Sequence, residues 1–323
     1  MQGRPTIVVP GRMSEFVRER LPDHFQPVFL DAADPALVTA DLAASVSGIA
    51  IQGKLPSGFV DAFPNLEIIA SFGVGYDGVD AAHAAGRGIV VTNTSDVLSE
   101  EVADTTIGLL INTLRRLPAA EQWLRQGRWA KEGPFALSPL TLRGRTVGLY
   151  GLGRIGRAIA RRLESFGVSI AYHTRQPRDD LAYAYYPTLV EMAGAVDTLI
   201  VIVPGTEETR RTVNAEVLAA LGDEGVLISV GRGTTVDEAA LADALQRGVI
   251  AAAGLDVFEN EPYVPDALLA LPNVSLLPHV GSASRATRKA MGDLVVDNLV
   301  SWFKTGAALT PVAETPFRRR KPV

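Results

Sequence analysis

Three residues that could perform acid–base and anion-binding chemistry each follow a short β-branched segment. Arg232 stands between two glycines after one such segment, and Glu261 and His279 follow the next two. In open α/β sheets, ligands bind beyond the carboxyl ends of the strands, so one site can collect all three side chains. An arginine can pair with a carboxylate, and a histidine is the commonest general acid or base. The position of His279 at a strand end in this expected crevice makes it a candidate general acid or base.

Each of these residues also has an ordinary explanation when it is taken alone. Arg232 fits a surface arginine, Glu261 an exposed loop acid, and His279 a structural histidine. The two glycines beside Arg232 favour chemistry, because they free the backbone to aim the side chain. The chain has only 4 histidines, and one of them follows a strand at the expected ligand edge.

A glycine motif follows another strand-like segment. Gly151, Gly153 and Gly156 form the pattern G-x-G-x-x-G between that segment and a helical pattern. The first glycine permits a tight turn, the second lets the backbone approach a pyrophosphate, and the third lets helix and strand pack closely. The free N–H groups of the helix N-terminus favour phosphate. Because strand, motif and helix occur together, we predict a dinucleotide site.

The next strand carries information about the ribose of that dinucleotide. It spans Val168–Tyr172 and is followed by His173, Thr174 and Arg175, whereas the first carboxylate is Asp179. An acid at the end of this strand would hold a 2′-hydroxyl, and an arginine there would pair with a 2′-phosphate. The sequence therefore favours NADP, with a solvated arginine and use of both cofactors as the alternative.

The elements that must position these residues alternate between strands and helices, which is typical of a parallel α/β sheet. Helical patterns include Arg154–Phe166 and Glu238–Arg247. The predicted strands are Thr6–Pro10, Gly48–Gln52, Ile68–Phe72, Ile89–Asn93, Thr146–Tyr150, Val168–Tyr172, Thr198–Val203, Gly225–Val230, Ala251–Leu255 and Val274–Leu277.

Two long helices and one irregular stretch separate the groups of strands. A helix is predicted over Ser99–Leu117, with Ser99 as its N-cap and Pro118 as its stop. A second long helix spans about Arg285–Lys304. The stretch Gln122–Leu140 has no clear period and is interpreted as a surface loop or as an arm that packs on a second subunit.

Composition excludes several classes of protein. The net charge of −5 argues against a nucleic-acid partner, which would need a basic face. No apolar stretch is long enough to span a membrane, so we expect a cytoplasmic protein. The chain has no cysteine, hence no disulfide or thiolate metal site, and no cluster of other ligand residues predicts a metal. The basic tail 318–321 is interpreted as a solvated terminus.

Taken in order, these segments resemble the successive motifs of the D-isomer-specific 2-hydroxyacid dehydrogenase family. Within that family, the chain most resembles the NADPH-dependent glyoxylate/hydroxypyruvate reductases. The resemblance covers nearly the whole chain, and the joint pattern is more specific than any single motif. It is carried by residues 72–80, 93–104, 151–156, 231–233, 254–262 and 278–281.

The resemblance implies hydride transfer between NADP(H) and a small 2-keto acid or its D-2-hydroxy acid. Arg232 is implied to bind the substrate carboxylate and polarise the keto oxygen, and His279 to be the general acid in reduction. Glu261 is implied to hydrogen-bond His279 and favour its charged form. The backbone N–H groups of Val74 and Gly75 are implied to help hold the carboxylate.

Lys54 follows the strand Gly48–Gln52 and is a candidate to contact the distal group of the substrate, with a solvated lysine as the alternative. Asp256 is implied to contact the nicotinamide side of the cofactor. NADP(H) is the preferred cofactor, and NAD(H) is the second candidate. The full set of expected cofactor contacts is Thr106, Gly151, Gly153, Arg154, Ile155, Gly156, His173, Thr174, Arg175, Val203, Pro204, Val230, Gly231, Arg232, Asp256, His279, Gly281 and Ser282.

The resemblance also implies an α/β architecture of two doubly wound parallel-sheet domains. A Rossmann-type cofactor domain, residues 99–290, is inserted into a flavodoxin-like substrate domain made of residues 1–98 and 291–323. Homologues of this kind are usually dimers, so we expect a homodimer.

Two other functions stay open at this point. One is a related dehydrogenase for a different substrate, such as an aryl-pyruvate, 2-ketogluconate, formate or phosphite. The other is a nucleotide-gated interaction protein of the corepressor kind. The combination of Arg232, Glu261 and His279 favours catalysis.

Overall fold

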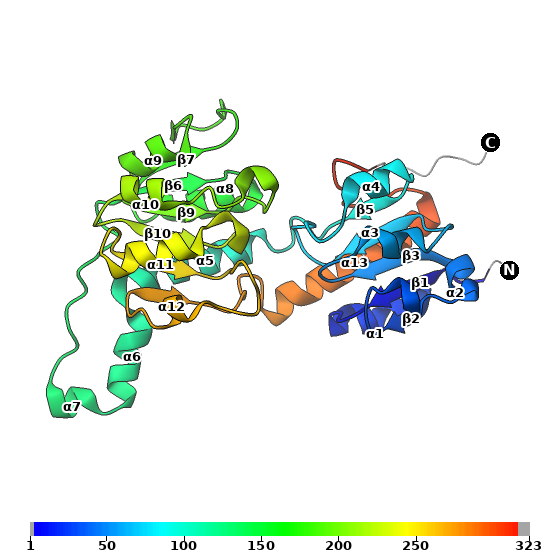
Figure 1. Ribbon diagram of the computed structural model, residues 1–323, viewed down its shortest axis with the longest axis horizontal. Helices are drawn as coiled ribbons and strands as arrows, with labels where there is room; N and C mark the ends of the chain where they lie inside the picture. Colours follow the sequence, from blue (N-terminus) through cyan, green and yellow to red (C-terminus); the bar gives the residue numbers. More distant parts are fainter. Residues whose placement is uncertain (1–2, 316–323) are drawn as a thin grey trace. The chain divides into compact units, whose positions relative to one another are not determined.

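The computed structural model describes residues 3–315, and backbone contacts divide the chain into two compact units (Figure 1). Unit 1 comprises Met1–Leu98 and Ser284–Val323, and unit 2 comprises Ser99–Ala283. The second division falls at Ser284, whereas the resemblance implied a boundary at about residue 291. The basic tail 318–321 lies outside the described residues.

Unit 1 is built on a five-stranded parallel sheet with the strand order β2-β1-β3-β4-β5. Its strands are β1 (Thr6–Pro10), β2 (Gln26–Leu30), β3 (Val46–Ile51), β4 (Ile68–Ser71) and β5 (Val90–Thr92). Its helices are α1 (Glu15–His24), α2 (Ala40–Ser45), α3 (Ser57–Asp61), α4 (Ala81–Gly86) and α13 (Arg285–Thr305), with a 3₁₀ turn at Pro35–Leu37. This strand order is the flavodoxin-like one.

Unit 2 is built on a seven-stranded parallel sheet with the order β12-β11-β10-β9-β6-β7-β8, which is the Rossmann order extended by one strand. Its strands are β6 (Thr146–Tyr150), β7 (Ser169–His173), β8 (Ala184–Tyr185), β9 (Thr198–Val201), β10 (Val226–Ser229), β11 (Ala252–Leu255) and β12 (Val274–Leu276). Its helices are α5 (Ser99–Arg115), α6 (Leu117–Arg125), α7 (Arg128–Glu132), α8 (Arg154–Glu164), α9 (Leu189–Ala195), α10 (Ala215–Leu221), α11 (Glu238–Gln246) and α12 (Asp266–Leu269), with 3₁₀ turns at Glu207–Thr209 and Gly233–Thr235.

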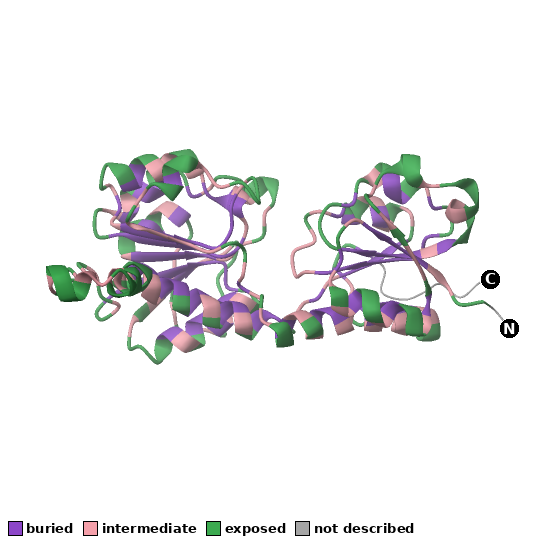
Figure 2. Ribbon diagram, turned by 90° about the horizontal axis from the view of Figure 1, so that it is seen from below, coloured by how far each residue is buried: buried purple, intermediate pink, exposed green. Residues whose placement is uncertain are grey.

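Helices cover both faces of each sheet, so the buried strands lie between two helical layers (Figure 2). In unit 2, α5 and α8 form one core with the sheet, and α9, α10 and α11 form another on the opposite face. In unit 1, α1 packs on α13, while α3 and α4 share a core on the other face. The prediction of two doubly wound parallel-sheet domains is confirmed.

Helix α5 lies very close to the sheet of unit 2 at Gly254 in β11. A Cβ atom at that position would be 2.5 Å from Thr113 Oγ1 and 2.9 Å from Leu109 Cγ. Both of these side chains belong to the buried stripe of α5. Glycine is therefore required for this helix to sit on the strand.

The structure corrects the boundaries predicted around the long helix. Ser99 is its first residue rather than its N-cap, and the helix ends at Arg115 because Arg116 adopts a left-handed φ of 52°. Pro118 does not stop a helix. It lies in the first turn of α6, where a missing N–H costs nothing.

Several elements were not predicted from the sequence pattern, and three segments show why. The stretch Gln122–Leu140 is not a plain loop, because it contains the end of α6 and the whole of α7. Strand β2 lies at a sheet edge and contains Pro27, so its pattern is not that of a central strand. Strand β8 has only two residues. None of the helices described in residues 3–315 is long and apolar enough to cross a membrane.

The close approach at Gly254 predicts a specific loss of stability. Gly254→Ala should lower the free energy of unfolding by about 1–3 kcal/mol, because the methyl group overpacks the helix–sheet contact. Gly194→Ala is the matched control, since the nearest atom to a Cβ in that exposed helical position is 4.0 Å away. Urea unfolding of both variants checks this, and equal stabilities would contradict it.

Candidate active site

Five strands of unit 2 end at the same level and place their loops along one edge of the sheet. In the strand register, Val201 pairs with Tyr150 and with Ser229, and Leu255 pairs with Ser229 and with Leu276. The loops that follow these strands carry the glycine motif, Arg232, Glu261 and His279. The sheet therefore positions these groups along a single edge of one compact unit.

The glycine motif has the geometry of a phosphate-binding turn. Gly151 has a φ of 103°, which residues other than glycine rarely adopt. A Cβ at Gly156 would overlap the Gly151 carbonyl. No atom lies within 4 Å of a Cβ position at Gly153, the residue before α8, so the space above this helix N-terminus is open. Arg154 and Ile155 form the first turn of that helix. The turn fits a dinucleotide pyrophosphate.

The end of β7 presents the residues expected at the cofactor ribose. His173 is half-buried, and its Nδ1 lies 2.9 Å from the carbonyl oxygen of Tyr186. Thr174 Oγ1 donates to the carbonyl of Gln176, whereas Arg175 is exposed. A carboxylate further along, that of Asp180, is paired with Arg157 at 2.7 Å. The exposed guanidinium of Arg175 fits a 2′-phosphate.

The loop after β10 is packed tightly against its two neighbours. A Cβ at Gly231 would lie 2.6 Å from the carbonyl oxygen of Val203, and one at Gly233 would overlap the backbone of Phe258. A Cβ at Gly205, after Pro204, would lie 3.1 Å from Arg232 Cβ. Glycines thus allow three loops to meet around a half-buried Arg232.

Glu261 and His279 form the charged pair of the site. The carboxylate Oε2 of Glu261 lies 2.7 Å from His279 Nδ1, and its Oε1 accepts a hydrogen bond from the N–H of Phe258 at 3.1 Å. Burial opposes ionisation of Glu261, but the hydrogen bond and charge of His279 outweigh it and hold the pKa of this carboxyl below its usual value. Because Glu261 occupies Nδ1, the opposite ring nitrogen, Nε2, is the one that a substrate can use.

Asp256 has a role that sequence reasoning missed. Its carboxylate is 2 % exposed and accepts hydrogen bonds from the N–H groups of Val280 at 2.7 Å and Gly281 at 2.8 Å. Burial raises the pKa of Asp256, although these two hydrogen bonds lower it. The carboxylate fixes the two peptides that follow His279, whose φ of 54° is left-handed. Its position after a strand gave no hint of this contact, which depends on a loop 24 and 25 residues further along the chain.

The remaining predicted cofactor contacts differ in exposure. Val203 and Ser282 are half-buried, and Val230 is buried beside Gly231. Thr106 is completely buried, and its hydroxyl donates to the carbonyl of Val102 within α5. The predicted contact of Thr106 with the cofactor stays a prediction.

In unit 1, the predicted substrate-binding residues lie on adjacent loops after β3 and β4. The carbonyl of Val74 accepts from the Asn93 side chain at 2.9 Å. Among residues 3–315, no hydrogen-bond acceptor is found for the backbone N–H groups of Val74 and Gly75. A Cβ at Gly78 would lie 3.1 Å from Lys54 Cα, so the two loops are in contact.

The described residues contain no group of three His, Asp or Glu side chains that could hold a metal ion. The groups at the edge of unit 2 instead suit proton transfer beside a bound dinucleotide. A histidine held by an ionised glutamate can donate a proton, and an arginine can stabilise negative charge on an oxygen atom.

Comparisons with known proteins agree with this chemistry. The family model described as "D-isomer specific 2-hydroxyacid dehydrogenase, NAD binding domain" matches residues 107–281. A glyoxylate/hydroxypyruvate reductase A of Arabidopsis thaliana is 49% identical over 267 residues, which cover 81% of this chain and 85% of that protein. A hydroxyphenylpyruvate reductase of Plectranthus scutellarioides is 49% identical over 253 residues, covering 78% and 80%.

A solved structure is more similar still. The NADPH-dependent glyoxylate/hydroxypyruvate reductase of Sinorhizobium meliloti, in complex with NADP and malonate, is 73% identical and has a TM-score of 0.97. The match covers 98% of this chain and 99% of that one. The chain is thus an oxidoreductase that uses a nicotinamide cofactor, and it belongs to the D-isomer-specific 2-hydroxyacid dehydrogenase family.

Proposed function

We propose that this protein reduces small 2-keto acids with NADPH, with glyoxylate and hydroxypyruvate as its main substrates. The observation that carries the proposal is the Glu261–His279 pair, held at the same sheet edge as Arg232 and the glycine motif. Relatives named for this activity support the choice of substrate. Unit 2 is the proposed cofactor domain, and unit 1, with Val74, is the proposed substrate domain.

The proposed mechanism assigns one task to each group. When bound, NADPH supplies a hydride, which reduces C2 of the keto acid. His279 donates a proton from Nε2 to the keto oxygen and becomes neutral, which completes the alcohol. Glu261 holds Nδ1 and thereby orients the ring. Arg232 binds the carboxylate and stabilises the negative charge that develops on the oxygen.

The proposal extends to the secondary contacts of the substrate. The free N–H groups of Val74 and Gly75 are proposed to donate to the substrate carboxylate. Lys54 is proposed to contact the distal group of a larger substrate. A cytoplasmic location is part of the same proposal, because a cysteine-free chain fits a reducing compartment.

A second candidate substrate class has its own support. The hydroxyphenylpyruvate reductase is as similar to this chain as the plant glyoxylate/hydroxypyruvate reductase, at 49% identity. An aryl-pyruvate is therefore the alternative substrate. A binding protein without turnover is the outcome that would remove catalysis altogether.

Initial rates of NADPH oxidation test the reaction and its residues together. The parent protein should turn over glyoxylate and hydroxypyruvate faster than phenylpyruvate or 2-ketogluconate.

His279→Ala should lower kcat by a factor of about 10²–10⁴, because the proton donor is lost while cofactor binding stays. Arg232→Ala should chiefly raise the KM of the keto acid. Cofactor binding without turnover of any keto acid would overturn the proposal, and near-parent rates for His279→Ala would remove its acid role.

Cofactor preference is tested at Arg175. Arg175→Ala should raise the KM for NADPH about tenfold or more, because an ionic hydrogen bond to the 2′-phosphate is lost, and change the KM for NADH little. Arg178→Ala, on the same exposed segment, is the matched control. Equal losses with both cofactors after the Arg175 change would remove the structural basis for an NADP preference.

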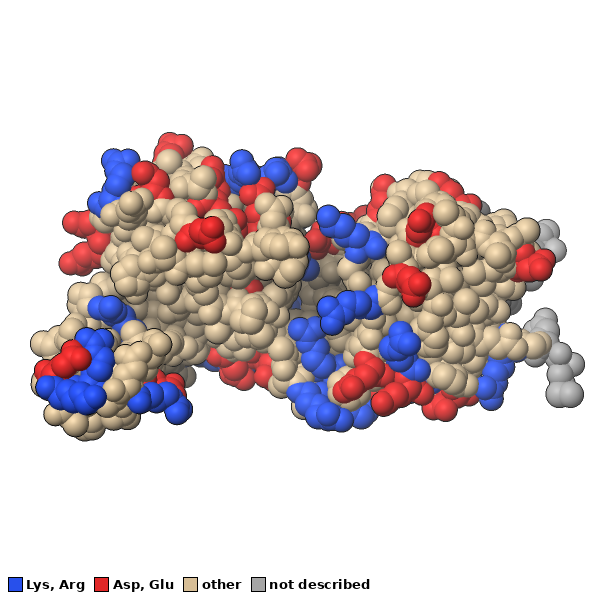
Figure 3. All heavy atoms as spheres, turned by 60° about the horizontal axis from the view of Figure 1, so that its bottom comes forward, with Lys and Arg blue, Asp and Glu red and all other residues tan. Residues whose placement is uncertain are grey.

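We further propose that the protein is a homodimer that uses an arm made of residues 116–140. No residue of α6 or α7 is buried, and the exposed fractions of Leu124, Trp129 and Leu137 are 55%, 62% and 93%. Large apolar side chains gathered in water mark an interaction surface. Figure 3 shows charges of both signs on the arm beside uncharged surface.

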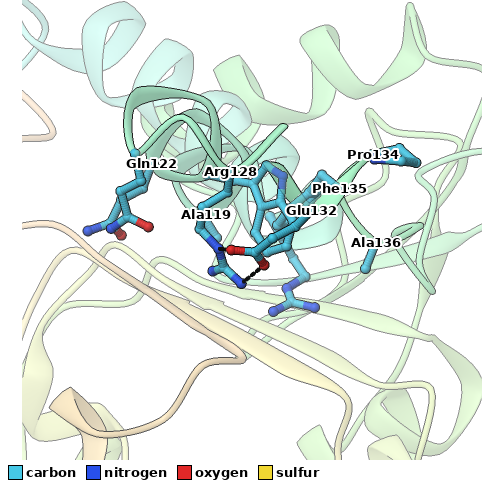
Figure 4. A pocket seen from close by; sticks show the side chains of 10 residues that line it. Ala119, Gln122, Arg128, Glu132, Pro134, Phe135 and Ala136 are labelled. Carbon is cyan, nitrogen blue, oxygen red and sulfur yellow. Dashed lines mark hydrogen bonds and ion pairs between the residues drawn. The ribbon is translucent and has the colours of Figure 1, made fainter. Parts of the chain in front are cut away.

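The arm also contains a hollow of about 490 Å³ (Figure 4). Trp123 and Phe135 line it with rings 5.8 Å apart, and Arg128 lies 3.6 Å from the centre of the Trp123 ring. Arg128 is held there by two hydrogen bonds to Glu132, of 2.8 and 2.7 Å. These contacts give the arm a defined shape, which suits a surface for a second copy of the chain.

Light scattering measures the oligomeric state directly. The parent should have twice the chain mass of 34.4 kDa, and Leu124→Glu combined with Trp129→Glu should give a monomer. Phe166→Glu, outside the arm and 45% exposed before the change, should leave the dimer intact. A monomeric parent, or a double variant that still forms dimers, would refute the assignment to the arm.

A further inference from the structure

Three loops of unit 2 are joined by a cluster of charges that the proposed mechanism does not use. Glu259, on the loop after β11, has a side chain that is 12% exposed. It accepts hydrogen bonds from Arg210 at 3.1 Å and from Arg211 at 3.2 and 2.9 Å. Its backbone N–H donates to the Glu238 carboxylate at 2.8 Å. Exposed ion pairs contribute little to stability, whereas this carboxylate is nearly buried and binds two arginines.

Arg211 touches all three loops. It belongs to the loop after β9, its N–H donates to the Thr234 carbonyl at 2.8 Å, and its guanidinium reaches Glu259. Thr234 belongs to the turn that begins at Arg232, where the N–H of Thr235 donates to the Arg232 carbonyl at 3.1 Å. The backbone of Arg211 thus contacts the loop of Arg232, and its side chain contacts the loop of Glu261.

The backbone of Arg211 is held in an uncommon conformation. Its φ of 48° is left-handed, a region that non-glycine residues occupy only when the surroundings hold them there. A glycine would relieve that strain at no loss of fold. An interaction of the arginine side chain must therefore offset the strain. In the described residues, its guanidinium donates hydrogen bonds to the carboxylate of Glu259.

The charges around Glu259 explain why arginine is needed there. Burial raises the pKa of Glu238, and the negative charges of Glu259 and Glu261 raise it further, whereas Arg211 lowers it. Three carboxylates thus gather on one loop edge. Without the positive charge, repulsion would push the loop after β11 away from its neighbours.

The same loop determines where the proton donor is held. Glu259 directly follows Phe258, whose N–H orients Glu261 and whose backbone leaves no room for a side chain at Gly233. A shift of this loop would move Glu261 relative to His279. Small misplacements of reacting groups cost large factors in rate.

We propose that Arg211 and Glu259 are positioning residues, which hold Glu261 and Arg232 in place for proton transfer to the keto oxygen. The inference rests on the proposed function, because it assigns the pair to the roles of His279 and Arg232. Neither residue of the pair touches substrate, and both act through the loops that they join.

The test compares Arg211→Gly, Glu259→Gln and the double variant in keto-acid reduction with NADPH. Arg211→Gly and Glu259→Gln should each lower kcat about tenfold, with the KM for NADPH and the thermal midpoint close to parent. The double variant should lose no more than the worse single variant, since both changes break the same contact. Arg211→Lys, which keeps a positive charge, should recover part of the rate.

The control is Arg247→Ala, which breaks an exposed ion pair with Asp243 in α11 and should leave kcat unchanged. If His279→Ala is inactive while Arg211→Gly and Glu259→Gln have parent kcat, the positioning role is overturned and the proposed function stands. Losses that multiply in the double variant would also overturn it, because they would show independent effects. A parent without keto-acid reduction would refute both proposals.

Discussion

The site depends on the hydrogen bonds that the buried carboxylate of Asp256 accepts from the backbone after His279. An ionised carboxylate that is 2 % exposed costs several kcal/mol of desolvation unless it is hydrogen-bonded. Asp256 meets that condition with the N–H groups of Val280 and Gly281. These bonds hold His279 at a left-handed φ that its own side chain disfavours. Without this anchor, nothing in the local sequence would aim the imidazole at Glu261.

Close packing between loops gives the same site its precision. The loops after β9, β10 and β11 meet at Gly205, Gly231 and Gly233, where a Cβ would press on a neighbouring loop. Loops are usually the mobile part of a fold, and rigid function on them requires a supporting scaffold. Here the support comes from the strand register, which ends the strands at one level, and from contacts that exclude side chains. The proposed positioning pair, Arg211 and Glu259, adds an ion pair between two of these loops.

The sequence predicted those features that follow from local pattern. Each strand of the sheet interior is a short apolar run, and the glycine motif lies where strand and helix patterns meet, so the fold class and the edge bearing His279 could be inferred. Strand β2 was not predicted, because an edge strand that contains a proline does not form such an apolar run. The helix break at Arg116 was not predicted either, because no sequence pattern marks an arginine in the left-handed conformation. Pro118 fitted the end of one helix as well as the beginning of the next.

Contacts between distant loops lie beyond any local pattern. Asp256 and Gly281 are separated by 25 residues, and Arg211 and Glu259 by 48. Their residue types allowed several roles, and only the folded arrangement selects one. Thr106 is a further example, because its sequence position does not show that its hydroxyl donates to the Val102 carbonyl within α5.

Two carboxylates, one that contacts His279 and one that contacts the residues after it, differ in a way that assigns their tasks. Burial raises the pKa of Asp256, whereas the hydrogen bond and charge of His279 bring the pKa of Glu261 below its usual value despite burial. Two acids pushed in opposite directions indicate two different roles. Asp256 uses its oxygens on backbone amides and serves as an anchor for the loop. Glu261 is left as the hydrogen-bond partner of the imidazole, so one carboxylate orients the ring while the other fixes the loop that follows it.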